Sequence, residues 1–274
     1  MNHKIKIGVF CLAVLFGKSS YGQTKADTTA MVKEFTRVMA FADQPYLSFK
    51  TVTKMDAVPV MQAQDTLSYQ GTFFKNQSDF YYNNGQEEIY VQDSFMIQIN
   101  QNRKSIWISK VDMASKKKNN VLHVDDKQLQ EFFRKEYTIE KTKINPMTSG
   151  LNFVAKQKSD AQTITTNIKL EYTLKDYLPV LMQIEMNMQQ PLNDQLLAEI
   201  KNENADSSGL IQTIENVKYV VRRQKISVAF SDITNTKVRA MQMPSWKDIL
   251  SYDETAHEFS AKELYKDYEI TKTF

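Results

Sequence analysis

The chain is nearly free of cysteine. Its 274 residues include one, Cys11, which lies inside an apolar run near the N-terminus. If that segment is removed during export, the remaining chain has no disulfide, no thiolate metal site and no cysteine nucleophile. Such a chain depends on its hydrophobic core for stability, and about 250 residues are enough to bury one.

Glycine and histidine are scarce as well, with seven and three residues respectively. Phosphate-binding loops and dinucleotide turns need glycine where the backbone approaches the ligand closely. The Gly-x-Ser-x-Gly motif of serine hydrolases is absent. His123 and His257 each lack a second histidine at metal-ligand spacing. We therefore expect no cofactor, no metal site and no enzymatic activity, with a carboxylate-based hydrolase as the less favoured alternative.

Long hydrophobic runs are missing too. The longest, from Ile7 to Phe16, is well short of the roughly 20 residues that span a bilayer. Lys4 and Lys6 precede this run, and small residues at Ser20 and Gly22 follow it. This pattern predicts a secretory signal peptide over residues 1–22, cleaved after Gly22. We expect a periplasmic or secreted protein without a transmembrane segment in the mature chain.

Neither sign of charge is in excess. The sequence has 35 lysines and arginines against 32 acidic residues, and three of the lysines lie within residues 1–22. The mature chain therefore carries 32 basic and 32 acidic residues. A formal charge of zero gives no general attraction to nucleic acid or to anionic lipid, so nucleic acid is not an expected partner.

The hydrophobic pattern that is present changes from helical to alternating. Met31, Phe35 and Val38 recur at helical spacing and predict a first helix with one apolar side. From Tyr46 to about Val111 the period is two, which predicts about five strands with a hairpin turn at Asn84-Gly85. A short helix is expected at 126–134. The clearest strands follow it, at 164–174 and 180–188.

These elements predict a mainly β fold with flanking helices. We expect a single curved antiparallel sheet that forms an incomplete barrel covered by helices, over residues 23–235. Residues 191–209 interrupt the sheet as a short helix and a polar loop. Residues 236–274 are expected to form a helical or irregular tail that packs on the domain or extends it.

The apolar sides of the two clearest strands are the candidate ligand-binding surface. The residues expected to line it are Leu170, Tyr172, Val180, Met182, Ile184 and Met186. Methionine side chains are flexible and fill irregular space, so they suit both a packed core and an adaptable wall around an acyl chain. Alternation does not distinguish a filled interior from a hollow one, and both interpretations stay open.

Two further groups have alternative interpretations. Arg222 and Arg223 are consecutive and therefore point to opposite sides of a strand. Either both are solvated, or the inward one binds an acidic head group or a carbonyl. In the tail, Trp246 and Tyr265 are residue types that anchor protein interfaces. They either dock an envelope protein or pack on the chain's own sheet.

The order of the motifs resembles the outer-membrane lipoprotein carrier (LolA-like) superfamily. The segments that carry the resemblance follow the first helix and are 71–75 (Gly-Thr-Phe-Phe-Lys), 80–87 (Phe-Tyr-Tyr-Asn-Asn-Gly-Gln-Glu) and 93–100 (Asp-Ser-Phe-Met-Ile-Gln-Ile-Asn). The resemblance covers about residues 27–235. It implies an incomplete barrel with a concave apolar face. It also implies a non-enzymatic periplasmic protein that binds a lipid, an acyl chain or another apolar ligand. The alternative is an interaction or sensor module with a filled core.

Overall fold

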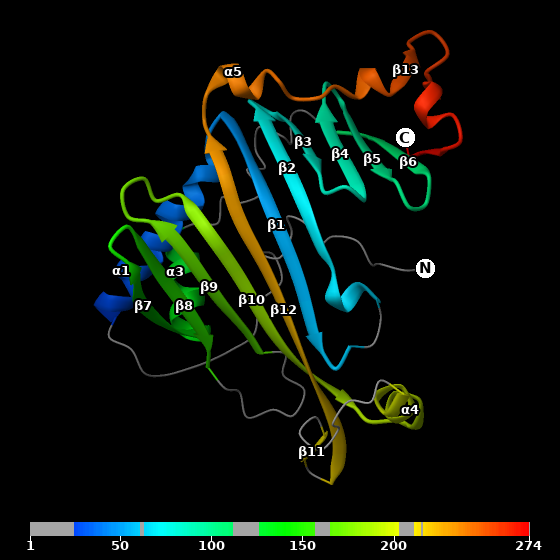
Figure 1. The fold of residues 1–274 in the computed structure, drawn as a ribbon. Helices are drawn as coiled ribbons and strands as arrows, with labels where there is room; N and C mark the ends of the chain where they lie inside the picture. Colours follow the sequence, from blue (N-terminus) through cyan, green and yellow to red (C-terminus); the bar gives the residue numbers. More distant parts are fainter. Residues whose placement is uncertain are drawn as a thin grey trace.

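The protein is built on one large twisted sheet (Figure 1). The structure, a computed structural model, describes residues 25–60, 63–111, 126–156, 165–202, 211–214 and 216–273. The expected signal peptide at 1–22 lies outside these ranges. The expected change from a helix to alternating strands is present, because α1 is followed by six strands between residues 46 and 110.

The helices are short and are separated by long stretches of strand. They are α1 (Lys25–Met39), α3 (Asp126–Glu136), α4 (Asp194–Asn202) and α5 (Lys237–Ala240), with 3-10 turns η1 (Ala40–Asp43), η2 (Ala63–Thr66), η4 (Trp246–Asp248) and η5 (Glu263–Tyr265). The strands are β1 (Tyr46–Val58), β2 (Ser68–Asn76), β3 (Asp79–Asn83), β4 (Glu87–Gln92), β5 (Phe95–Asn100), β6 (Ser105–Lys110), β7 (Tyr137–Asn145), β8 (Thr148–Ala155), β9 (Thr165–Thr173), β10 (Pro179–Pro191), β11 (Ile211–Ile214), β12 (Val217–Thr234), β13 (Leu250–Asp253), β14 (Glu258–Ala261) and β15 (Glu269–Lys272).

The main sheet is mixed and open. Its strand order is β15-β6-β5-β4-β3-β2-β1-β12-β10-β9-β8-β7, with β11 added beside β12, while β13 and β14 form a separate hairpin. All neighbours are antiparallel except β15 and β6, which are parallel. The expectation of a purely antiparallel sheet was therefore wrong. The reason is that the tail returns to the far edge by a long connection, and long connections permit parallel pairing.

The hairpin predicted at Asn84-Gly85 is confirmed. β3 and β4 pair in antiparallel register on either side of it. Gly85 has a φ of 82°, a left-handed conformation that glycine adopts without a steric cost. The Asn84 side-chain oxygen accepts hydrogen bonds from the backbone N–H groups of Gln86 and Glu87, at 3.0 and 2.7 Å. Local turn chemistry therefore sets this register.

One face of the sheet, called the helix face below, packs against α1 and α3. A row of facing residues crosses five strands of this face, and each member is buried: Phe153, Ile168, Ile184, Ile226 and Met55. Val32, Phe35 and Val38 of α1 and Phe133 of α3 pack against the β7–β9 end of this face. Phe35 and Val38 therefore form the buried side of α1, as the sequence predicted. Val32, one turn before Phe35, is buried beside them.

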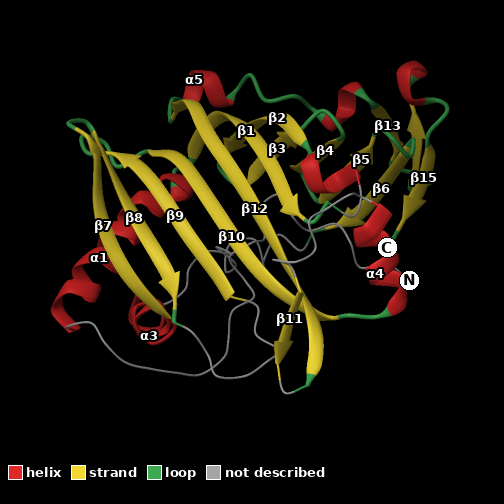
Figure 2. Ribbon diagram, turned by 60° about the horizontal axis from the view of Figure 1, so that its bottom comes forward, coloured by secondary structure: helices red, strands yellow, loops and turns green. Residues whose placement is uncertain are grey.

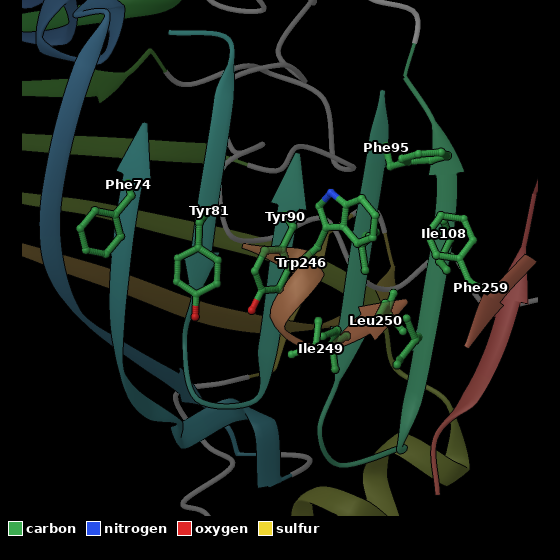
Figure 3. Close-up of a cluster of buried hydrophobic side chains, with 12 residues drawn as sticks. Phe74, Tyr81, Tyr90, Phe95, Ile108, Trp246, Ile249, Leu250 and Phe259 are labelled. Atoms are coloured by element: carbon green, nitrogen blue, oxygen red, sulfur yellow. The ribbon is translucent and has the colours of Figure 1, made fainter. Parts of the chain in front are cut away.

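The opposite face, called the tail face below, is covered at the other end of the sheet. Phe74, Tyr81, Tyr90 and the isoleucines of β5 and β6 form a core with Trp246, Ile249, Leu250 and Phe259 of the tail (Figure 3). Figures 1 and 2 show α1 and α3 beside β7–β9, and the tail beside β4–β6. The molecule thus has two main cores on opposite faces of one sheet, joined by the central strands β1, β12 and β10.

Candidate binding site on the helix face

Five of the six predicted lining residues, Leu170, Tyr172, Met182, Ile184 and Met186, lie on the helix face, but they differ in what they contact. Leu170 and Tyr172 are completely buried in the core beneath α1 and α3. Leu170 faces Met182 across the β9–β10 ladder, and Met182 is partly buried against the same core. These residues therefore pack against the chain's own helices.

The other three also belong to β10. Ile184 is buried and faces Ile168, whereas Met186 is half-buried and faces Thr166. Val180 is half-buried and lies at a register shift between Pro179 and Leu181. The regular alternation expected from the sequence is broken there, because a bulge places an extra residue in one strand of the pair.

A group that the sequence reasoning missed lies beside them. Five phenylalanines, called the phenylalanine row below, contact one another across the helix face. The ring centroids of Phe49 and Phe73 are 4.7 Å apart in a stacked pair, and Phe73 stacks on Phe80 at 6.0 Å. Phe230 of β12 lies 5.7 Å from Phe49. Phe41 of η1 contacts both Phe49 and Phe230, at 5.7 and 6.0 Å.

All five rings of the phenylalanine row are half-buried. Single exposed apolar residues are common on protein surfaces, but a contiguous apolar patch marks a site of interaction. One signal in the sequence points toward this row: Leu47, Phe49, Thr51 and Thr53 alternate along β1 on one side. The pairing of β1 with β2, which places Phe73 opposite Phe49, is visible only in the structure.

η1 is held in place at the end of α1 by a lysine. The Lys75 ammonium donates a hydrogen bond to the Ala42 carbonyl at 2.8 Å. Burial lowers the pKa of Lys75, and the nearby Asp43 carboxylate acts in the opposite direction. On the other side of α1, the Lys141 ammonium contacts the Glu34 carboxylate oxygens at 2.6 and 2.9 Å. This hydrogen bond is the main reason that the pKa of Lys141 is raised.

The two consecutive arginines point to opposite sides of β12. Arg222 faces Met188 and shares the helix face with Ile226. Its guanidinium pairs with Asp65 of η2, whose side chain is 2% exposed. Arg223 is solvated, with its side chain 67% exposed. The inward arginine is thus matched by an internal carboxylate, as a buried charge requires.

The two aromatic residues considered as partner anchors contact the chain's own sheet. Trp246 is 3% exposed within the tail-face core, between Phe95 and Phe259. Tyr265 is half-buried against the same core and packs on Tyr268. In this conformation the Trp246 ring has no surface to offer a second protein.

Two properties of the described part of the chain concern membranes and metals. Within the described ranges, no helix combines the length and apolarity that a membrane crossing requires. Among the same residues, the structure brings together no group of three or more histidine, cysteine, aspartate or glutamate side chains that could hold a metal ion.

Two solved structures are similar to the chain over most of its length. A DUF1329 family protein from Desulfovibrio piger has 10% identity and a TM-score of 0.30, and the match covers 84% of this chain and 99% of that one. A LolA superfamily protein from Nitrosomonas europaea has 8% identity and a TM-score of 0.26, covering 78% of this chain and 94% of that one. The second belongs to the superfamily that the sequence resembles. No family model and no curated protein matches the chain.

Proposed function

We propose that this is an exported, non-enzymatic binding protein that holds the acyl chain of a lipid or a similar apolar ligand on the helix face. In this proposal the curved sheet acts as an incomplete barrel with the helix face on its inner side. The observation that carries the proposal is the phenylalanine row, which presents five half-buried rings in contact on one face.

The chemistry of the row suits an acyl chain. Each methylene that leaves water contributes about 0.8 kcal/mol, so a fatty chain is held without a reactive side chain or a metal. Met182, Met186 and Val180 continue the half-buried apolar surface along β10. Leu170 and Tyr172 support this surface from beneath α1.

Binding is tested with the mature chain, residues 23–274, and the fluorescent fatty acid cis-parinaric acid. We expect saturable binding, and a lipid adduct in native mass spectra of protein purified from the periplasm. Phe49→Gln and Phe73→Gln each remove about 1.5–3 kcal/mol of apolar burial, so each should weaken the binding of the probe at least about tenfold.

Val52→Gln is the matched control, because Val52 lies on β1 but points away from the row and is 37% exposed. It should leave the affinity for the probe unchanged. A wild-type protein that shows no adduct and no saturable probe binding would overturn the proposal. So would equal loss of affinity in Val52→Gln and Phe49→Gln with intact circular dichroism.

Export is tested separately by N-terminal sequencing of the periplasmic protein. We expect the first residue to be Gln23, as the small residues at Ser20 and Gly22 predict. Retention of residues 1–22 on a cytoplasmic protein would contradict this part of the proposal and leave the ligand experiment unaffected.

A further inference from the structure

An open pocket lies at one end of the helix face, where α1 and η1 approach the β9–β10 turn and the neighbouring ends of β1 and β12. Its volume is about 450 Å³, within the range of small-molecule sites. Its lining comprises Arg37, Ala40, Phe41, Gln44, Leu47, Asp176, Tyr177, Leu178, Ile233 and Asn235.

The lining is divided between an apolar floor and a polar rim. Leu47 is buried, and Phe41, Leu178 and Ile233 are half-buried. The four polar side chains, Arg37, Gln44, Asp176 and Asn235, are all exposed. Because Phe41 also contacts Phe49 and Phe230, the floor of the pocket continues directly into the phenylalanine row. Phe41 therefore belongs both to the pocket and to the phenylalanine row.

The arginine at the rim is held by a stack of rings. The Arg37 guanidinium carbon lies 3.7 Å from the centroid of the Tyr177 ring. Tyr177 in turn stacks on the buried Tyr172, with centroids 5.8 Å apart and planes inclined by 15°. A cation above an aromatic face is attracted to it, and a planar guanidinium keeps its N–H donors free at its edge.

The backbone at Tyr177 is in a conformation that aromatic residues seldom adopt. Its φ is 55°, in the left-handed region. Two hydrogen bonds to Thr173 hold the turn: the Tyr177 N–H donates to its carbonyl at 3.0 Å, and the Leu178 N–H donates to its hydroxyl at 3.1 Å. Glycine or asparagine would fit this backbone with less strain, and the contacts of the Tyr177 ring with Arg37 and Tyr172 help to hold it there.

We propose that this pocket binds the zwitterionic head group of a single-chain amphiphile whose acyl chain lies on the phenylalanine row. The two charged side chains of the rim have opposite signs. Arg37 would bind the anionic part of the head group, with N–H donors from the Gln44 and Asn235 amides, and Asp176 would bind the cationic part. This inference rests on the proposed function and adds the class of ligand.

The test compares three lipids with the same saturated acyl chain, each below its micellar concentration. They are a lysophosphatidylethanolamine, a lysophosphatidylglycerol and a monoacylglycerol, which are zwitterionic, anionic and neutral. Displacement of cis-parinaric acid from the mature protein should show the zwitterionic lipid binding at least about tenfold more tightly than the neutral one.

Variants assign the preference to the rim. Arg37→Gln should abolish the preference for the zwitterionic over the neutral lipid, while binding of the neutral lipid stays at the wild-type level. Asp176→Asn should shift the preference toward the anionic lipid. Lys33→Gln is the matched control, because Lys33 lies on the same helix, is exposed and does not line the pocket.

The possible failures are distinct. If all three lipids bind with equal affinity to the wild type and to Arg37→Gln, the head-group site is overturned and the proposed function stands. A wild-type preference for the anionic lipid would also overturn the site, since it leaves Asp176 without a role. If none of the three lipids displaces the probe or binds, the proposed function itself fails.

Discussion

The side chain of Gln92 connects β4 to the start of the tail by two hydrogen bonds. Its side-chain NH₂ group donates to the Pro244 carbonyl at 2.6 Å, and its side-chain oxygen accepts from the Trp246 N–H at 3.1 Å. The side-chain amide of Gln92 thus satisfies two backbone groups of the tail, the Pro244 carbonyl and the Trp246 N–H, which would otherwise lack hydrogen-bond partners.

Gln92→Leu should lower the free energy of unfolding by about 1–3 kcal/mol, because it leaves these two backbone groups unsatisfied. Urea unfolding followed by circular dichroism measures the loss. Gln70→Leu, at an exposed position of β2, is the control and should change stability by less than about 0.5 kcal/mol. Equal losses in the two variants would show that the Gln92 hydrogen bonds contribute nothing to the free energy of unfolding.

Buried tyrosines predict how stability depends on alkaline pH. Burial raises the pKa of Tyr81, Tyr82 and Tyr137 from 10.0 to about 12. Above pH 10 the unfolded chain loses these phenolic protons while the folded chain keeps them. The contribution of these three phenols to the free energy of unfolding is therefore fully present below pH 10. It falls as the pH rises toward 12, by up to about 1.4 kcal/mol per pH unit for each residue.

Urea unfolding across this pH window, with phenolate absorbance recorded in parallel, checks the prediction. Tyr137→Phe should flatten the dependence, since phenylalanine has no proton to lose. A free energy of unfolding that stays constant from pH 10 to 12 would contradict it.

At the scale of elements, the two tryptophans provide a comparison of packing. Trp246 in η4 is 3% exposed, whereas Trp107 in β6 is 56% exposed. Trp246→Ala should cost about 3–5 kcal/mol, because it empties the centre of the tail-face core. Trp107→Ala should stay within about 0.5 kcal/mol. Chemical denaturation monitored by circular dichroism measures the free energy of unfolding of both variants. Similar losses in the two would contradict the packing of the tail in the tail-face core.

The helices and turns that depend on local chemistry were more predictable than the pairing of the strands in the tail. The Asn84-Gly85 turn and the helical stripe of α1 follow from local chemistry, and the structure places both where the sequence indicates. The hairpin β13–β14 and the strand β15 could not be derived in the same way. The segment Glu269–Lys272 becomes a strand through pairing with β6, more than 150 positions away, and the hairpin β13–β14 forms where the tail packs on the tail-face core.

At the scale of the whole molecule, the two main cores should unfold together. Ile139 lies in the core on the helix face and Ile108 in the core on the tail face, and both are completely buried. Ile139→Val and Ile108→Val should each cost about 0.5–1.5 kcal/mol. Because they share no contacts, the double variant should lose the sum within about 0.5 kcal/mol.

The fluorescence of Trp246, recorded in a Trp107→Phe background so that it is the single tryptophan, tests whether the molecule is one cooperative unit. Ile139→Val should shift the fluorescence transition of Trp246 as much as it shifts the circular dichroism transition, although the two residues lie in different cores. Two separate transitions would mean that the halves on either side of β1 and β12 unfold independently.

The candidate site was harder to predict than the sheet. The alternation in β9 and β10 identifies an apolar side, and Leu170, Tyr172, Met182 and Ile184 do share it. The alternation does not reveal which part of that apolar side is covered by the chain's own helices. That depends on where α1 packs, and the phenylalanine row is assembled from η1, β1, β2, β3 and β12 only by tertiary register.

The parallel strand β15 has a consequence for the order of synthesis. β6 is made long before its partner, and during that interval its outer backbone groups form an open template. Any nascent or clipped chain without residues 269–272 presents that template to neighbouring molecules. Self-association of truncated molecules would therefore begin at the edge of β6.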